Sequence, residues 1–196
     1  MPDPVALGFD TSAAHCAAAL LRGDTVLAQV SEEMTKGQAE RLFPLLEEML
    51  SGAGLDWRDL HVIGVGIGPG NFTGIRIAVA AARGLALSLG IPAVGVTATE
   101  AAALDLPRPC RVVLPLRADQ VVWQDFGPVA GDRPQQAATG SLPPGPAPAA
   151  PVVPTAVAIA RIALTRRTAP GPRPAPLYLR PADAAPARDA APLILP

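Results

Sequence analysis

Residues 64–76 read GVGIGPGNFTGIR, and residues 77–89 continue the segment as IAVAAARGLALSL. The apolar run at 62–65 predicts a buried strand, and the glycines that follow it predict a tight loop. The long apolar stretch from about residue 73 to residue 89 predicts a helix. A strand that leads through a glycine loop into a helix is typical of an α/β fold.

The glycine loop could either bind an anion or form a tight structural turn. It consists of Gly68, Pro69, Gly70, Asn71, Phe72, Thr73 and Gly74. Backbone N–H groups at the start of a helix can bind an anion. The usual nucleotide fingerprints fail, because Asn71 and Thr73 stand where a third glycine is required and no lysine follows. The spacing favours the structural turn.

The predicted helix at 73–89 is apolar on all sides, whereas a helix that covers a sheet needs only one apolar side. The stripe that suits a sheet consists of Ile75, Ala78, Val79, Ala82, Leu85, Ala86 and Leu89. The opposite side consists of Ile77, Ala80, Ala81, Gly84 and Leu87. We expect this second side to form an intermolecular helix–helix interface, flanked by Arg76 and Arg83. The alternative is that residues 106–196 fold over it.

The surrounding elements predict a mixed sheet with helices packed on it. Five short apolar runs predict strands, at residues 5–9, 17–21, 26–30, 62–65 and 93–96. Gly23 predicts the turn of a hairpin. A helical stripe over 39–50 contains Pro44, which should kink the helix or delay its regular part until after residue 43. Thr97 and Glu100 fit a capping box that opens a third helix.

Prolines divide the chain into two unlike parts, with 5 of the 24 in residues 1–100 and 19 in residues 101–196. We therefore predict an N-terminal subdomain at 1–105 and a reduced, proline-rich C-terminal subdomain and tail at 106–196. In the second part, apolar runs at 112–114 and 121–123 predict a hairpin, and residues 155–164 predict a short helix. Residues 128–154 are so rich in proline that we expect neither a hydrogen-bonded ladder nor a helix there.

Composition excludes several classes of protein. The 16 basic and 17 acidic residues give a net charge of -1, which argues against a nucleic-acid binder that works by bulk charge. Cys16 and Cys110 form no CxxC motif, so neither a disulfide framework nor a zinc site is predicted. The N-terminus lacks a basic region, and the apolar stretch at 77–91 contains Arg83 and is short for a bilayer span. We expect a cytoplasmic protein without a membrane segment.

Four motifs resemble those of one family. Residues 68–77, GPGNFTGIRI, closely resemble the GPGSFTGLRIG signature of the TsaB family of bacterial tRNA threonylcarbamoyladenosine (t6A) biosynthesis. Residues 8–12 (GFDTS) resemble its AIDTS strand end, and residues 38–44 (QAERLFP) resemble its H-S-x-x-L-L-P helix segment. Residues 176–180 (PLYLR) resemble its C-terminal PxYLR. The resemblance is continuous over about residues 5–105 and patchy afterwards.

The resemblance implies the acetate kinase/actin-like (ASKHA) fold, which is RNase H-like, with a reduced second subdomain. It also implies a non-catalytic scaffold that activates a TsaD-type subunit, which transfers threonylcarbamoyl to adenosine 37 of tRNAs. The two subunits would form a heterodimer through matching helices, a TsaE-type ATPase would join them, and a homodimer is possible when the chain is alone. Strong direct tRNA binding and a required cofactor are not expected.

The ASKHA resemblance also leaves weak ATP and magnesium binding as a hypothesis. In such folds an acidic residue and a hydroxyl after the first strand lie near the nucleotide, and Asp10, Thr11 and Ser12 have these positions. The other interpretation is a hydrogen-bonded turn. The alternative function is accordingly a small ASKHA-fold ATPase or phosphotransferase, although a second phosphate loop is missing. No metal-binding spacing is present, and His15 and His61 are expected to be surface or hydrogen-bonded strand residues.

Four positions depart from the family pattern. Gln38 stands where the family usually has His, and Asn71 stands where the motif has Ser. Ala78 replaces a common Gly, and Pro115 stands where relatives have Asp. The departure at Pro115 makes the second subdomain degenerate relative to the family pattern.

Overall fold

A five-stranded sheet forms the centre of the computed structural model, which describes residues 3–116, 118–128 and 133–179. Its strands are β1 (Val5–Asp10), β2 (His15–Arg22), β3 (Thr25–Glu33), β4 (Val62–Gly66) and β5 (Ala93–Val96). Their order is β3-β2-β1-β4-β5, in which β1, β2 and β3 are antiparallel while β1, β4 and β5 are parallel. The predicted mixed sheet is confirmed, and the five strands predicted before residue 105 all lie in it.

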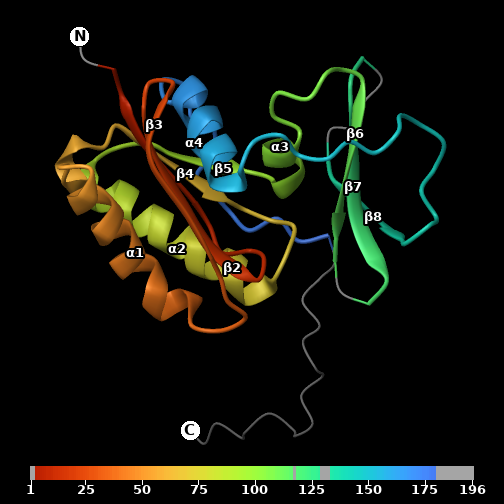
Figure 1. Cartoon of the computed structure of the whole chain (residues 1–196), viewed down its shortest axis with the longest axis horizontal. Helices are drawn as coiled ribbons and strands as arrows, with labels where there is room; N and C mark the ends of the chain where they lie inside the picture. The colour runs from red at the N-terminus through yellow and green to blue at the C-terminus, as the bar shows by residue number, and fades with distance from the viewer. Residues whose placement is uncertain (1–2, 117, 129–132, 180–196) are drawn as a thin grey trace, which may run out of the picture.

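Helices cover both faces of this sheet (Figure 1). Helices α1 (Gln38–Gly52) and α2 (Phe72–Leu89) pack on one face, and α4 (Thr155–Arg166) packs on the other. Alternation along the strands produces the two layers, since Leu7 and Phe9 of β1 face the first pair of helices while Ala6 faces α4. The short α3 (Ala98–Ala102) begins at the predicted cap, where the Thr97 side chain accepts a hydrogen bond from the Glu100 N–H. A 3₁₀ turn, η1 (Trp57–Asp59), precedes β4.

Glycines in two central strands allow α4 to approach the sheet closely. A Cβ on Gly8 would lie 2.5 Å from the Ala156 carbonyl oxygen, and a Cβ on Gly64 would lie 2.7 Å from that of Ile159. Both distances are too short for any larger residue. Helix α4 therefore forms a layer of the N-terminal sheet, although the division predicted at residue 105 assigns it to the second part. A boundary at residue 105 therefore separates the five-stranded sheet from the sheet that follows it, but it also separates the five-stranded sheet from α4, which packs on it.

A second, three-stranded antiparallel sheet follows, with β6 (Cys110–Pro115), β7 (Gln120–Phe126) and β8 (Gln135–Ala138). The prediction that residues 128–154 hold no ladder is wrong at β8, which pairs with β7 from Gln120 to Trp123. Residues 135–138 contain no proline, so their N–H groups are available for pairing.

The buried Arg111 holds the proline-rich segment after β8 in place. Its Nε donates to Asp125 Oδ1 (2.6 Å), and its Nη1 donates to the Pro143 carbonyl (2.5 Å). The hydrogen bond between the two side chains raises the pKa of Arg111 and lowers that of Asp125. The Ala149 N–H also donates to the Arg111 carbonyl (2.9 Å), so both the side chain and the backbone of Arg111 hold this segment.

Helix α1 runs from Gln38 to Gly52 with Pro44 inside it, rather than beginning after residue 43. Pro44 is exposed, so the carbonyl of Glu40 that it leaves without an intrahelical partner can bind water. Burial of Leu45, Leu46 and Met49 on the other side stabilises the helix through the proline.

Helix α2 is a sheet-packed helix of unusual apolarity. Its 18 residues have a mean hydropathy of 1.4, so length and composition alone would let it cross a membrane. It packs instead on β4 and β1 through Ile75, Ala78 and Val79, which are buried. The apolarity of the remaining side therefore needs another explanation.

The buried thiol of Cys16 should make the free energy of unfolding depend on pH in the alkaline range. Burial in the core raises its pKa from 9.0 to about 11, and Glu32 adds to the effect. Between these values the unfolded chain loses this proton while the folded chain keeps it, so the free energy of unfolding should fall as pH rises from 9 to 11. Urea unfolding at about pH 8 and about pH 10.5 should show a smaller fall for Cys16→Ala than for the wild type. Equal falls would contradict the assignment.

Candidate functional site

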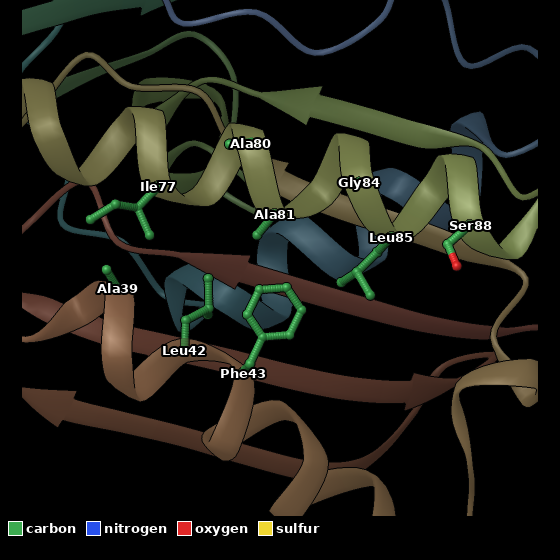
Figure 2. Close-up of a pocket in the computed structure, with 9 residues that line it drawn as sticks. All are labelled: Ala39, Leu42, Phe43, Ile77, Ala80, Ala81, Gly84, Leu85 and Ser88. Carbon is green, nitrogen blue, oxygen red and sulfur yellow. The ribbon is translucent and has the colours of Figure 1, made fainter.

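An apolar groove of about 560 Å³ lies between α1 and α2. Figure 2 shows its lining, which is Ala39, Leu42 and Phe43 from α1, and Ile77, Ala80, Ala81, Gly84, Leu85 and Ser88 from α2. All of these residues except Ser88 are apolar. Exposed apolar grooves of this kind are typical of surfaces that bind another molecule.

The two sides of α2 differ sharply in exposure. Ile75, Ala78 and Ala82 are fully buried against the sheet, whereas Leu87 is 82 % exposed. A Cβ on Gly84 would meet nothing within 4 Å. In the part of the chain that the structure describes, the residues after 105 leave this side open.

The predicted interface residues fall mostly within the groove. Ile77, Ala80, Ala81 and Gly84 line it, while Leu87 lies on the same helix outside the lining. Arg76 and Arg83, which were expected to flank the interface, are both exposed. That these residues bind a partner stays a prediction.

The groove residues of α1 were not predicted individually, because the pattern over residues 39–50 was described only as one helical stripe and the role of matching helices came from the family resemblance alone. Leu42 and Leu46 are buried as expected, but Phe43 is 42 % exposed and Ala39 is exposed too. The adjacent apolar residues Leu42 and Phe43 could have indicated a second apolar side on this helix. Neighbouring helical residues point about 100° apart, so only one of the two can point directly at the sheet.

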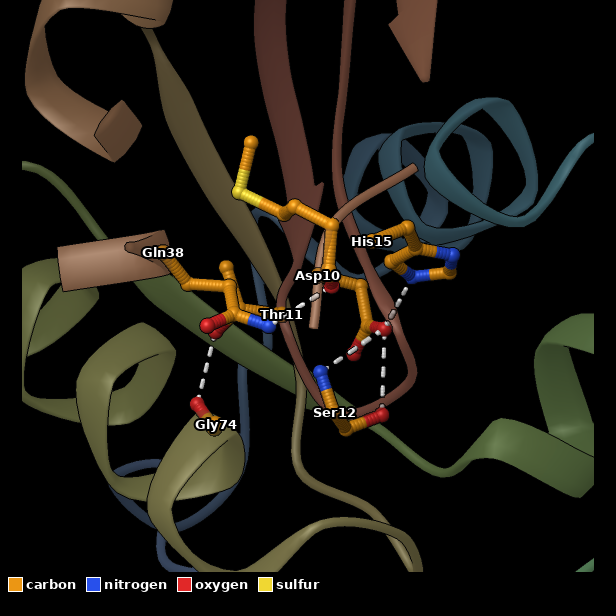
Figure 3. Close-up of polar contacts among 7 residues, drawn as sticks. Asp10, Thr11, Ser12, His15, Gln38 and Gly74 are labelled. Carbon is orange, nitrogen blue, oxygen red and sulfur yellow. Dashed lines mark hydrogen bonds and ion pairs between the residues drawn. The ribbon is translucent and has the colours of Figure 1, made fainter. Parts of the chain in front are cut away.

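The glycine loop packs tightly against the turn that follows β1 (Figure 3). Thr11 Oγ1 donates to the Gly74 carbonyl (2.6 Å), and the Asn71 N–H donates to the Ser12 carbonyl (2.6 Å). A Cβ on Gly70 would collide with the Ser12 carbonyl oxygen, and a Cβ on Gly74 would collide with that of Thr11. Glycine is therefore required at both positions, and the geometry is that of a tight structural turn.

The Asp10 carboxylate is buried and bound within its own turn. Its Oδ2 accepts hydrogen bonds from the Ser12 N–H (3.1 Å) and Oγ (3.0 Å) and lies 2.8 Å from His15 Nε2 (Figure 3). The link to His15 was not anticipated, because it depends on how β2 returns beside β1. Nucleotide binding by Asp10, Thr11 and Ser12 stays a prediction. Within the described ranges, no group of three or more His, Cys, Asp or Glu residues could hold a metal ion.

Comparisons with known proteins assign the family. A family model described as TsaD, tRNA N6-adenosine threonylcarbamoyltransferase, matches residues 25–125. An uncharacterised protein of Mycobacterium tuberculosis is 31% identical over 198 residues, which cover 92% of this chain and 93% of that protein. The tRNA threonylcarbamoyladenosine biosynthesis protein TsaB of Bacillus subtilis is 39% identical over 97 residues. The chain belongs to the TsaB/YeaZ family.

The likeness to TsaB proteins lies mainly in one part of the chain. The alignment with Bacillus subtilis TsaB covers 50% of this chain and 42% of that protein. The solved structure named YeaZ from Pseudomonas aeruginosa covers 90% of this chain and 100% of its own, with a TM-score of 0.72 at 23% identity. This likeness, together with the sheet order, confirms the predicted ASKHA fold.

The departures from the TsaB motifs are structurally accommodated. Gln38 Nε2 donates to the Met34 carbonyl (3.0 Å) at the start of α1, and Asn71 Oδ1 accepts from the Gly74 N–H (3.0 Å). Asn71 therefore caps α2, a role that the family's serine is equally suited to perform. Ala78 is buried on the sheet, and Pro115 is exposed at the end of β6. Of the PxYLR motif, Arg180 lies outside the described residues.

Proposed function

We propose that this chain is a non-catalytic scaffold that activates the TsaD-type subunit of the complex that forms t6A at position 37 of tRNA. A role in t6A biosynthesis is supported by family membership, since TsaB relatives are named for that pathway. The observation that carries the scaffold role is the open apolar groove between α1 and α2. Stable interfaces resemble a domain core that has been cut in half, and this groove has that composition.

The TsaD-type subunit is the partner that best suits the groove. The match to the TsaD family model indicates that the two proteins share an architecture, so the partner would present a similar pair of helices. The small residues Ala80, Ala81 and Gly84 would let the facing helices approach closely. Without that subunit, two copies of this chain could pair through the same face. A TsaE-type ATPase would join the assembled complex in the cytoplasm.

The scaffold role needs no cofactor in this chain. Asp10 and Ser12 are hydrogen-bonded to each other, which supports a structural rather than a catalytic turn. The net charge of -1 supports tRNA binding by the partner rather than by this subunit. No feature of the described residues favours the alternative of a small ATPase or phosphotransferase.

The proposed function predicts a direct effect on tRNA. Depletion of this chain in its source organism should lower the t6A content of tRNA, measured by mass spectrometry of hydrolysed nucleosides. Re-expression of the wild-type chain should restore t6A, whereas re-expression of Gly84→Trp should not. Unchanged t6A after depletion would overturn the proposed function.

A further inference from the structure

A short C-terminal segment returns to the beginning of α2. We call residues 174–179 the strap. The Leu177 N–H donates to the Ile67 carbonyl (2.8 Å) beside the glycine loop, and Pro174 is buried near Gly95. Tyr178 then reaches the start of α2, where its ring stacks on Phe72 and its hydroxyl accepts a hydrogen bond from Arg76, 102 residues earlier in the chain.

The strap and α2 together hold the Arg76 side chain in one place. Its guanidinium carbon lies 3.7 Å from the centroid of the Phe72 ring, and its Nε donates to the Tyr178 hydroxyl (2.9 Å). The Phe72 and Tyr178 rings are stacked, with centroids 4.7 Å apart and 28° between their planes. A guanidinium held in this way has lost rotamer freedom before a partner arrives, so less entropy is lost on binding.

The arrangement leaves Arg76 able to bind an anion. The Tyr178 hydroxyl accepts a hydrogen bond from Nε of Arg76, and among the described residues Arg76 makes no ion pair. The two terminal amino groups of Arg76 can therefore donate to another acceptor. Such parallel N–H donors fit the two oxygens of a carboxylate. Arg76 is exposed and lies one helical turn before Ala80, at the end of the groove.

The charge of α2 specifies the partner surface. Its two charged residues, Arg76 and Arg83, are both basic, and it has no acidic residue. A complementary surface would therefore be an apolar helix face that carries Asp or Glu opposite Arg76.

We infer that Tyr178 positions Arg76 to bind a carboxylate of the TsaD-type subunit when that subunit docks in the groove. The inference rests on the proposed function, because it names one contact within that interface. Tyr178 acts here through Arg76 and is a positioning residue. The strap, which is distant in sequence, thereby becomes part of the docking surface.

A double-mutant cycle tests the inference, with the affinity for the TsaD-type subunit from the same organism measured by calorimetry. Arg76→Ala should weaken binding about tenfold, and Tyr178→Phe, which keeps the stacked ring, should weaken it about threefold. Tyr178→Phe should cause no further loss once Arg76 is alanine. Arg83→Ala is the matched control, because Arg83 lies two turns further along the same helix. In that background Tyr178→Phe should still weaken binding about threefold.

The free protein offers an independent readout. Tyr178 is the one tyrosine of the chain, so biosynthetic 3-fluorotyrosine gives a single fluorine resonance. Arg76→Ala should shift this resonance without any partner, and an unshifted resonance would overturn the inference. An equal loss from Tyr178→Phe in the wild-type and Arg76→Ala backgrounds would overturn it too, while leaving the proposed function intact. Failure of the wild-type chain to bind would overturn both.

Discussion

Gly84→Trp should abolish binding of the TsaD-type subunit while the isolated chain stays folded. Gly84 lines the groove on α2, and its Cβ direction is open, so an indole would fill the groove without meeting the core. A partner helix would then be unable to approach, and we expect its Kd to rise by at least about 100-fold, or about 2.7 kcal/mol. The free energy of unfolding should change by no more than about 0.5 kcal/mol, because the site is on the surface.

The matched control for this variant is Gly52→Trp. Gly52 is also a helical glycine with an open Cβ direction, but it lies at the end of α1 outside the groove lining. It should bind the partner as the wild type does. Ala80→Trp should repeat the effect of Gly84→Trp, since Ala80 is exposed and lines the same groove. Unfolding of both groove variants would show that this face is internal, and binding by both would show that the interface lies elsewhere.

Gly74→Ala should destabilise the chain strongly. A Cβ at this position would collide with the carbonyl oxygen of Thr11, a backbone atom that is itself held by the β1 turn. The loop and the turn would have to separate, and overpacking of this kind should lower the free energy of unfolding by about 3 kcal/mol. Urea unfolding at pH 7 measures the change.

The control for Gly74→Ala is the same substitution at another glycine of α2. Gly84→Ala meets nothing within 4 Å, so it should gain helix propensity and raise the free energy of unfolding by about 1 kcal/mol. The two variants should therefore shift stability in opposite directions. If Gly74→Ala were as stable as the wild type, the tight packing of the glycine loop on the turn would be wrong.

Local patterns were sufficient to predict most of the fold. Short apolar runs locate the five strands of the first sheet, and Thr97 with Glu100 locates the start of α3. The all-round apolarity of residues 73–89 indicated a second apolar side on α2, which the structure exposes. These features depend on residues within a few turns of one another, so the sequence carries them directly.

Features that depend on distant contacts could not be predicted. Strand β8 reads QQAA, without apolar alternation, and forms because β7 offers a pairing edge. The hydrogen bond from Arg76 to Tyr178 joins residues more than 100 positions apart, and the contact of His15 with Asp10 depends on how β2 returns beside β1. Phe43 contributes to the groove because α1 and α2 lie beside each other on the sheet. Tertiary packing, rather than local propensity, decides each of these.

The scaffold role is tested most simply by the mass of the chain, measured by light scattering during size exclusion, alone and mixed with the TsaD-type subunit from the same organism. We expect the mixture to give a single species with the mass of a 1:1 heterodimer. Two unshifted peaks, with this chain as a monomer, would show that the groove does not bind that subunit and would contradict the scaffold role.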